Sequence, residues 1–164
     1  MVSRYSKIAL VLILASFSSM VAINNLTDYW SNFEFVRHVL SMDTTLPDNQ
    51  AMYRSIHSVW VWHAAYALII LGELLTAVML ARGGVALWKA RYSRGNDFHR
   101  TKGIAILGLT AGFTVWLFGF MVVGGEWFLM WQSPDWNGQQ AAFRFYVAIL
   151  GCLIYVNQFD TDLE

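Results

Sequence analysis

The chain has little charge and a single cysteine, and both shortages narrow what it can be. Asp, Glu, Lys and Arg make up only 13% of its 164 residues, about half of the roughly 25% typical of soluble domains. One cysteine, Cys152, excludes an intramolecular disulfide and a thiolate metal cluster. The formal net charge is zero, so no nucleic-acid partner is indicated.

The motifs of common catalytic sites are also missing. The sequence has no Gly-rich phosphate loop after a strand, no nucleophile elbow and no His-Glu-x-x-His motif. Hydrolase and kinase functions therefore have no support, no catalytic residue is predicted, and a non-enzymatic role is favoured.

Apolar residues, in contrast, are abundant: they make up 57% of the chain, above the usual 45 to 50% or so. They gather in four runs that are long enough to cross a bilayer, the first of which lacks a good cleavage site for a signal peptide. The predicted spans are residues 7–24, 58–81, 103–123 and 143–158. We therefore predict an all-α membrane protein that forms a four-helix transmembrane bundle in one domain.

Two connecting segments carry unusual numbers of aromatic residues. In residues 24–57, Phe33, Val36 and Val39 recur at near-helical spacing, which predicts a short amphipathic helix at the membrane interface. Residues 124–145 contain three Trp and three Phe, and we call this segment the aromatic cap. Because Trp is enriched at lipid boundaries, the cap is predicted to fold against the bundle at the periplasmic surface.

The Lys and Arg residues are distributed unevenly along the chain. Eight of the eleven lie at the N-terminus or in residues 82–102. By the positive-inside rule, both termini face the cytoplasm of a bacterial inner membrane. The basic segment is explained by topology, and its functional interpretation is binding to anionic lipid head groups.

Glu73 is the one charged residue predicted to lie deep in the bilayer, where a carboxylate costs about 2.5 to 3.5 kcal/mol. His63, Tyr66 and Glu73 share one face of the second span, which predicts a polar seam. Thr110 and Asn157 lie at the same depth by helical rise, so they are the predicted partners of Glu73. The seam either fixes helix register by hydrogen bonding, or lines a proton path or a quinone-like groove.

Small residues on the third span form a second helix face. Gly108, Gly112, Val115 and Gly119 fall at helical spacing. This face is predicted to contact a neighbouring helix closely.

The histidines offer weak candidates for a metal or haem. His57 and His63 are about 240° apart around a helix and cannot share a metal there. A site would need His38, with Asp43 or Glu126 as an oxygen ligand. No cofactor is therefore the leading expectation, and a haem between His63 and His38 or a metal is the alternative.

The cap region supplies further candidates for contacts. Glu126 and Arg144 are predicted either to form an ion pair or to reach water separately. Asn24, Asn25 and Asp28 either end the first helix or bond to Gln139 and Gln140. The remaining cap candidates are the indoles of Trp127, Trp131 and Trp136.

Three motifs resemble a bacterial family of predicted small integral membrane proteins, grouped as a domain of unknown function. They are NNLTDYWSNFEFVRHVLSMD at 24–43, GFMVVGGEWFLMWQSPDWNGQQAAFRF at 119–145 and DTDL at 160–163. The resemblance implies four spans in an inner membrane and assigns no activity.

The favoured function is a non-catalytic binding or accessory subunit. Its cap would contact lipid, a protein partner or a second copy of the chain. The alternatives are a redox protein that interacts with haem, metal or quinone, and a proton or ion conduit.

Overall fold

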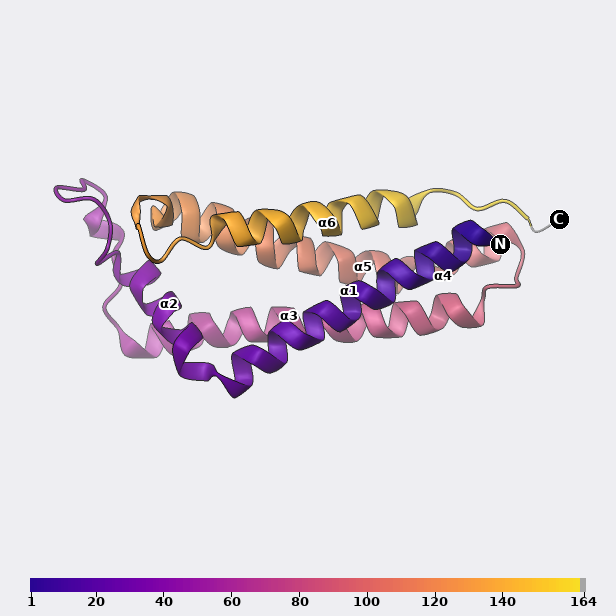
Figure 1. Ribbon diagram of the computed structural model, residues 1–164, viewed down its shortest axis with the longest axis horizontal. Helices are drawn as coiled ribbons and strands as arrows, with labels where there is room; N and C mark the ends of the chain where they lie inside the picture. Colours follow the sequence, from indigo (N-terminus) through magenta and orange to yellow (C-terminus); the bar gives the residue numbers. More distant parts are fainter. Residues whose placement is uncertain (163–164) are drawn as a thin grey trace.

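The computed structural model describes residues 1–162 as helices joined by short loops, with no strand among them (Figure 1). Leu163 and Glu164, the last residues of the acidic tail and of the DTDL motif, lie outside this range. The elements are α1 (Val2–Thr27), α2 (Tyr29–Ser41), η1 (Met52–Arg54), α3 (Val59–Lys89), α4 (Gly95–Thr101), α5 (Gly103–Phe113), η2 (Thr114–Trp127), η3 (Met130–Gln132) and α6 (Gln139–Asn157).

Four helices are long and apolar enough to cross a membrane, as predicted. They are α1, α3, the continuous stretch Gly95–Trp127 and α6. Both termini lie at one end of the bundle, which we call the terminal end (Figure 1). The all-α, four-span fold class is therefore confirmed. The positions of α2 and of the cap relative to a bilayer stay predictions.

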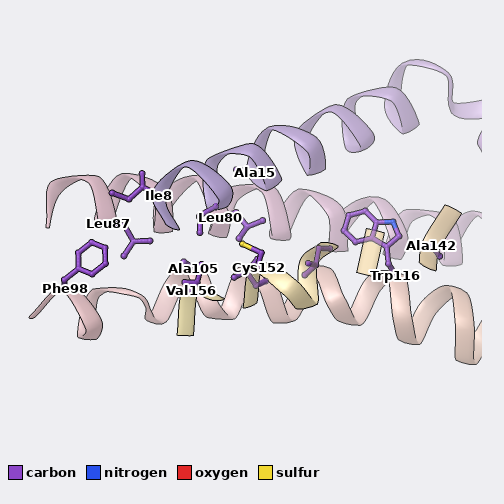
Figure 2. Packing of buried hydrophobic residues seen from close by; sticks show 13 residues of the cluster. Ile8, Ala15, Leu80, Leu87, Phe98, Ala105, Trp116, Ala142, Cys152 and Val156 are labelled. Carbon is purple, nitrogen blue, oxygen red and sulfur yellow. The ribbon is translucent and has the colours of Figure 1, made fainter. Parts of the chain in front are cut away.

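The core runs along the whole bundle, from Phe98 near the terminal end to Trp116 and Ala142 near the cap (Figure 2). Between these ends, small side chains such as Ala15 and Ala105 are buried where helices meet. Apolar helices gain no hydrophobic driving force from one another in lipid, so close packing of small residues holds them together.

Helix α3 runs past its predicted end at Ala81 to Lys89. Gly83 and Gly84 do not break it, because they are contact points between helices. A Cβ at Gly83 would lie 2.7 Å from the backbone of Ala105, and a Cβ at Gly84 would meet the Leu12 side chain.

The small-residue face of the third span contacts α3 over only part of its length. A Cβ at Gly108 would lie 3.0 Å from Leu80, and one at Gly112 would lie 2.9 Å from Thr76. Val115 packs against Gly72, whereas a Cβ at Gly119 meets nothing within 4 Å. The helix changes from α to π geometry at Thr114, and the wider turn rotates Gly119 off the contact face.

At the terminal end, the residues after α6 fold back onto the bundle. Asp160 is buried between Lys7 and Lys102, with Lys7 Nζ 2.9 Å from Asp160 Oδ1. Arg4 donates to the carbonyl oxygens of Arg91, Ser93 and Thr161. The segment 158–162, which we call the tail latch, therefore joins α1 to the start of the third span. The acidic residues of the tail latch are therefore part of the packed bundle.

The charge of Asp160 is stabilised by this arrangement. Burial alone would raise the pKa of its carboxyl group, but hydrogen bonds and charges from Lys102 and Lys7 outweigh burial and hold the pKa below its usual value. One further contact fastens the latch, because the backbone N–H of Gly95 donates to Asp162 Oδ1 at 2.6 Å.

Candidate functional site

Glu73 lies on the buried face of α3 and is only 2% exposed. Its Oε2 accepts a hydrogen bond from Asn25 Nδ2 at 2.7 Å, and the Tyr66 hydroxyl donates to the Asn25 carbonyl oxygen at 2.9 Å. Asn25 lies near the end of α1. One residue of α1 therefore connects two buried polar side chains of α3.

The partners predicted from depth, Thr110 and Asn157, are wrong. Both are exposed, and the Thr110 hydroxyl donates to the carbonyl oxygen of Ile106 in its own helix. Val115 contacts Gly72, and Gly112 lies against Thr76 and Ile149, so Thr110 and Asn157 lie nearer the terminal end than Glu73. Helical rise also does not give the rotation of a residue about the helix axis. Both side chains lie on outer faces of their helices.

His63 lies further along α3 and is covered by aromatic side chains of α2. Its Nδ1 is hydrogen-bonded to the Tyr29 hydroxyl at 2.6 Å, and its ring stacks on Phe33 with centroids 4.3 Å apart. The Tyr29 ring in turn contacts the Tyr66 ring at 4.7 Å. The polar seam of α3 is thus extended by Tyr29 and Asn25, which belong to other helices.

Glu73, Tyr66, Asn25 and Asn32 line a cavity of about 220 Å³, which we call the polar pocket. Its remaining walls come from α2, α3, η2 and α6. They are Phe35, Val36, Ile69, Trp116, Phe120, Gly138, Ala141, Ala142 and Phe145. The pocket therefore places one carboxyl group, a phenol and two amides in an otherwise apolar chamber.

A second cavity, of about 350 Å³, lies between α2, α3 and η2, and we call it the apolar groove. Leu68 and Phe118 line it and are 69% and 56% exposed, so the groove reaches the outer surface of the bundle. Gly119 also lines it. The rotation of Gly119 by the π-helical segment therefore contributes to the shape of this wall.

The two cavities are adjacent, because both are lined by Phe35, Val36, Ile69 and Phe120. The rings of Phe35 and Phe120 stack with centroids 6.1 Å apart. Gly138 allows this pair to sit close to the cap, since a Cβ there would lie 2.9 Å from Phe35. These shared side chains form the boundary between the groove and the pocket.

A family model described as "Predicted small integral membrane protein (DUF2165)" matches residues 3–159. The chain belongs to this family. The match contains every residue that lines the polar pocket and the apolar groove. No curated protein and no solved structure matches the chain.

In this DUF2165 chain, the candidate histidines lie in separate surroundings. His38 is bonded to Asp43 at 2.8 Å and to Arg37 at 2.7 Å, and it stacks on Trp136. His57 is exposed and contacts Ser55. Among residues 1–162, no group of three His, Cys, Asp or Glu side chains is arranged to hold a metal ion.

The cap contacts of this DUF2165 chain also differ in part from those expected. Glu126 and Arg144 are both exposed, and they form no ion pair within the described part of the chain. Asp28 accepts from Ser31, and the Asn24 carbonyl accepts from Asp28, so these two residues end α1. Trp136 is half-buried against His38, whereas Trp127 and Trp131 are exposed.

The side chains that sequence reasoning missed are Tyr29 and Asn32. They lie on α2, about 35 to 40 positions away in the chain from the residues they face. Their spacing along α2, at i and i+3, is the one available signal that they share a helix face with Phe33.

Proposed function

We propose that this protein binds a lipid-soluble molecule that has an apolar chain and a hydrogen-bonding head group. The chain would occupy the apolar groove, and the head group would occupy the polar pocket beside Glu73. One observation carries this proposal: a groove open to the surface adjoins a chamber that holds a buried carboxyl group.

The free-energy cost of burying the Glu73 carboxyl group supports the presence of a ligand. A carboxyl group deep in a membrane protein costs several kcal/mol unless it is fully paired. Asn25 supplies one hydrogen bond, and the carboxyl group also lines a cavity instead of being enclosed by protein. A residue that only fixed helix register would need no such space.

The position of the groove supports entry from the membrane. Its surface residues, Leu68 and Phe118, are apolar and lie on the spanning segments α3 and η2. A hydrophobic molecule dissolved in the acyl chains would reach the groove without crossing water. Its chain would stay in an apolar environment while its head group entered the bundle.

A conduit for protons or ions has less support. Beyond Glu73 toward the terminal end, the buried residues of α3 are Thr76, Ala77, Leu80, Gly83, Gly84 and Leu87. Thr76 alone among them is polar, and its hydroxyl is bonded to the Gly72 carbonyl. On α3, the polar seam therefore stops at Glu73.

An accessory subunit that contacts a protein partner is the second candidate. The indoles of Trp127 and Trp131 are 52% and 51% exposed, and Arg54 lies over the Trp127 ring. Such residues concentrate binding energy at protein interfaces. The same indoles also suit the head-group region of a bilayer, so this candidate has weaker support than ligand binding. Photo-crosslinking from position 131 in native membranes tests it, since a captured neighbour other than lipid would favour it.

The membrane we propose is the bacterial inner membrane, with both termini in the cytoplasm. The two termini lie at the same end of the bundle (Figure 1), and this end carries Arg4, Lys7 and the basic segment 82–102. Cysteine labelling from either side of the membrane, at exposed positions such as Asp48 and Asn96, tests this orientation.

Ligand binding is tested by filling the groove. Gly119→Leu places a side chain in the groove without meeting protein atoms near its Cβ. Gly151→Leu is a matched control, since Gly151 also has open space around it and lies on α6 outside the groove. Wild type and Gly151→Leu should copurify with an enriched amphiphile at about one per chain by native mass spectrometry. The amount of this amphiphile bound per chain should be at least about tenfold lower in Gly119→Leu. Equal lipid content in all three proteins would refute the proposal.

A further inference from the structure

We infer that the head group bound in the polar pocket is an aromatic ring that carries hydroxyl groups and donates a hydrogen bond to Glu73. The inference rests on the proposed function and names the ligand class. It follows from the hydrogen-bonding capacity that the protein leaves open, the size of the pocket and the side chains that form its walls.

The protein uses part of the hydrogen-bond donors that it brings to the pocket. Asn25 Nδ2 donates to Glu73 Oε2, and the Tyr66 hydroxyl donates to the Asn25 carbonyl. Asn32 Nδ2 donates to the Asp28 carbonyl at 3.3 Å. Each of these hydrogen bonds ends on a protein oxygen, and the Asn25 and Asn32 amide nitrogens each carry a second N–H.

A carboxylate oxygen of Glu73 also remains without a donor in the described part of the chain. Glu73 Oε1 has no hydrogen-bond partner among residues 1–162, although the residue is only 2% exposed. Within the same range, the Asn32 amide oxygen accepts no hydrogen bond either. A ligand that brings a donor to this carboxylate oxygen gains a charge-assisted hydrogen bond. A ligand with only carbonyl groups could accept from the amide N–H groups but would leave Glu73 Oε1 without a donor.

The walls of the pocket suit an aromatic ring. Trp116, Phe120 and Phe145 line the pocket. Their faces suit stacking or edge contacts with another ring. A cavity of about 150 Å³ is large enough to hold benzene, and this pocket measures about 220 Å³. A single ring with one or two oxygen substituents fits that volume.

The Phe35–Phe120 boundary fixes where the ring ends and the chain begins. Both side chains line the pocket and the groove. The chain of the ligand would pass beside them into the groove while the ring remained next to Glu73. The ligand class is therefore a hydroquinone or related phenol with an apolar tail.

Three probes with one shared decyl tail test the inference: a benzene-1,4-diol, its dimethyl ether and the corresponding quinone. Each is added under anaerobic conditions to purified full-length protein in detergent, and binding is measured by native mass spectrometry. We expect the diol to bind at least about tenfold more tightly than the ether and the quinone. Glu73→Gln should reduce the preference over the ether below about threefold. Glu126→Gln, which changes an exposed carboxylate, should preserve it.

The outcomes separate the inference from the proposed function. If no probe binds wild type better than Gly119→Leu, the proposed function fails. If the three probes bind equally, or the quinone binds most tightly, ligand binding stands and the inference is overturned. If Glu73→Gln keeps the preference, the methyl groups of the ether are excluded by shape and the hydrogen bond to Glu73 is refuted. The ranking on wild type decides even where the Glu73 variant does not fold.

Discussion

At the scale of single residues, the protein is organised around Asn25. Its side chain bonds to Glu73, and its backbone carbonyl accepts from Tyr66. It therefore satisfies two costly polar groups on α3 from a position on α1. Loss of either contact leaves an unpaired polar atom inside the bundle.

Replacement of Asn25 by Ala should destabilise the protein by about 1 to 3 kcal/mol, because the Glu73 carboxylate loses its donor. Asn24→Ala is the matched control, since Asn24 is exposed and its side chain makes no hydrogen bond among the described residues. Combining Asn25→Ala with Glu73→Gln should restore part of the loss, because no carboxylate then remains unpaired. Thermal unfolding in detergent measures all of these variants. Equal unfolding temperatures for Asn24→Ala and Asn25→Ala would contradict the prediction.

The sequence predicted which residues of α3 face inward but not what they meet. His63, Tyr66 and Glu73 follow helical spacing, so their shared face was visible in the chain. Their partners Asn25 and Tyr29 come from another span and from α2, whose rotations depend on tertiary packing. Helical rise predicted Thr110 beside Glu73, but Val115 contacts Gly72 at that level, and Thr110 faces outward.

At the scale of elements, close approach of backbones decides where helices touch. Gly83 of α3 faces Ala105 of α5, and a Cβ there would lie 2.7 Å from both the Cα and the nitrogen of Ala105. Backbone atoms cannot move aside as a flexible side chain can, so the two helices would have to separate.

Gly83→Ala should therefore lower stability by about 1 to 3 kcal/mol. Gly151→Ala serves as the control, because Gly151 is also in a helix but a Cβ added to it would meet no atom within 4 Å. That change should be neutral or stabilising by up to about 1 kcal/mol, since Ala has the higher helix propensity. The fraction folded during titration with a denaturing detergent reports both effects. A Gly83→Ala protein as stable as Gly151→Ala would show that α3 and α5 do not pack as described.

The π-helical segment η2 explains why the position of Gly119 was not predicted. Gly108 and Gly112 contact α3 as their spacing indicates, but η2 begins at Thr114 and its period differs from 3.6 residues. Wide turns have no simple signature in composition, because apolar residues suit α and π geometry alike. Gly119 consequently lines the apolar groove instead of a helix contact.

At the scale of the whole molecule, the four spans could be predicted because bilayer thickness fixes the length of an apolar helix. The tail latch could not be predicted, because nothing in the sequence distinguishes Lys7, Lys102 and Asp160 from other charged residues near the ends of spans. Their pairing requires the terminal ends of three spans to meet, which is a property of the assembled bundle. Positive charges at this end thus stabilise the fold in addition to any role in topology.

Acid should open the tail latch. Because the folded protein holds the pKa of Asp160 below its usual value, its charge stabilises the fold fully above the ordinary carboxyl pKa of about 3.9. That contribution is lost as the pH falls from there through the lower pKa of the folded state. For this reason, the unfolding temperature of the wild-type protein should fall steeply below about pH 4.

Asp160→Asn should remove the anion at every pH and leave Lys7 and Lys102 buried together. Breaking a buried ion pair in this way costs about 3 to 5 kcal/mol, so the variant should be much less stable than wild type at pH 7 and should lose less on acidification. Asp97→Asn, an exposed change on α4, should follow wild type throughout. Adding Lys102→Met to Asp160→Asn should recover stability, because one of the two uncompensated cations is then gone. If Asp160→Asn unfolds at the wild-type temperature at pH 7, the charges of the latch do not hold the ends of the spans together. The fold at that end would then depend on apolar packing around Phe98 and on the hydrogen bonds of Arg4.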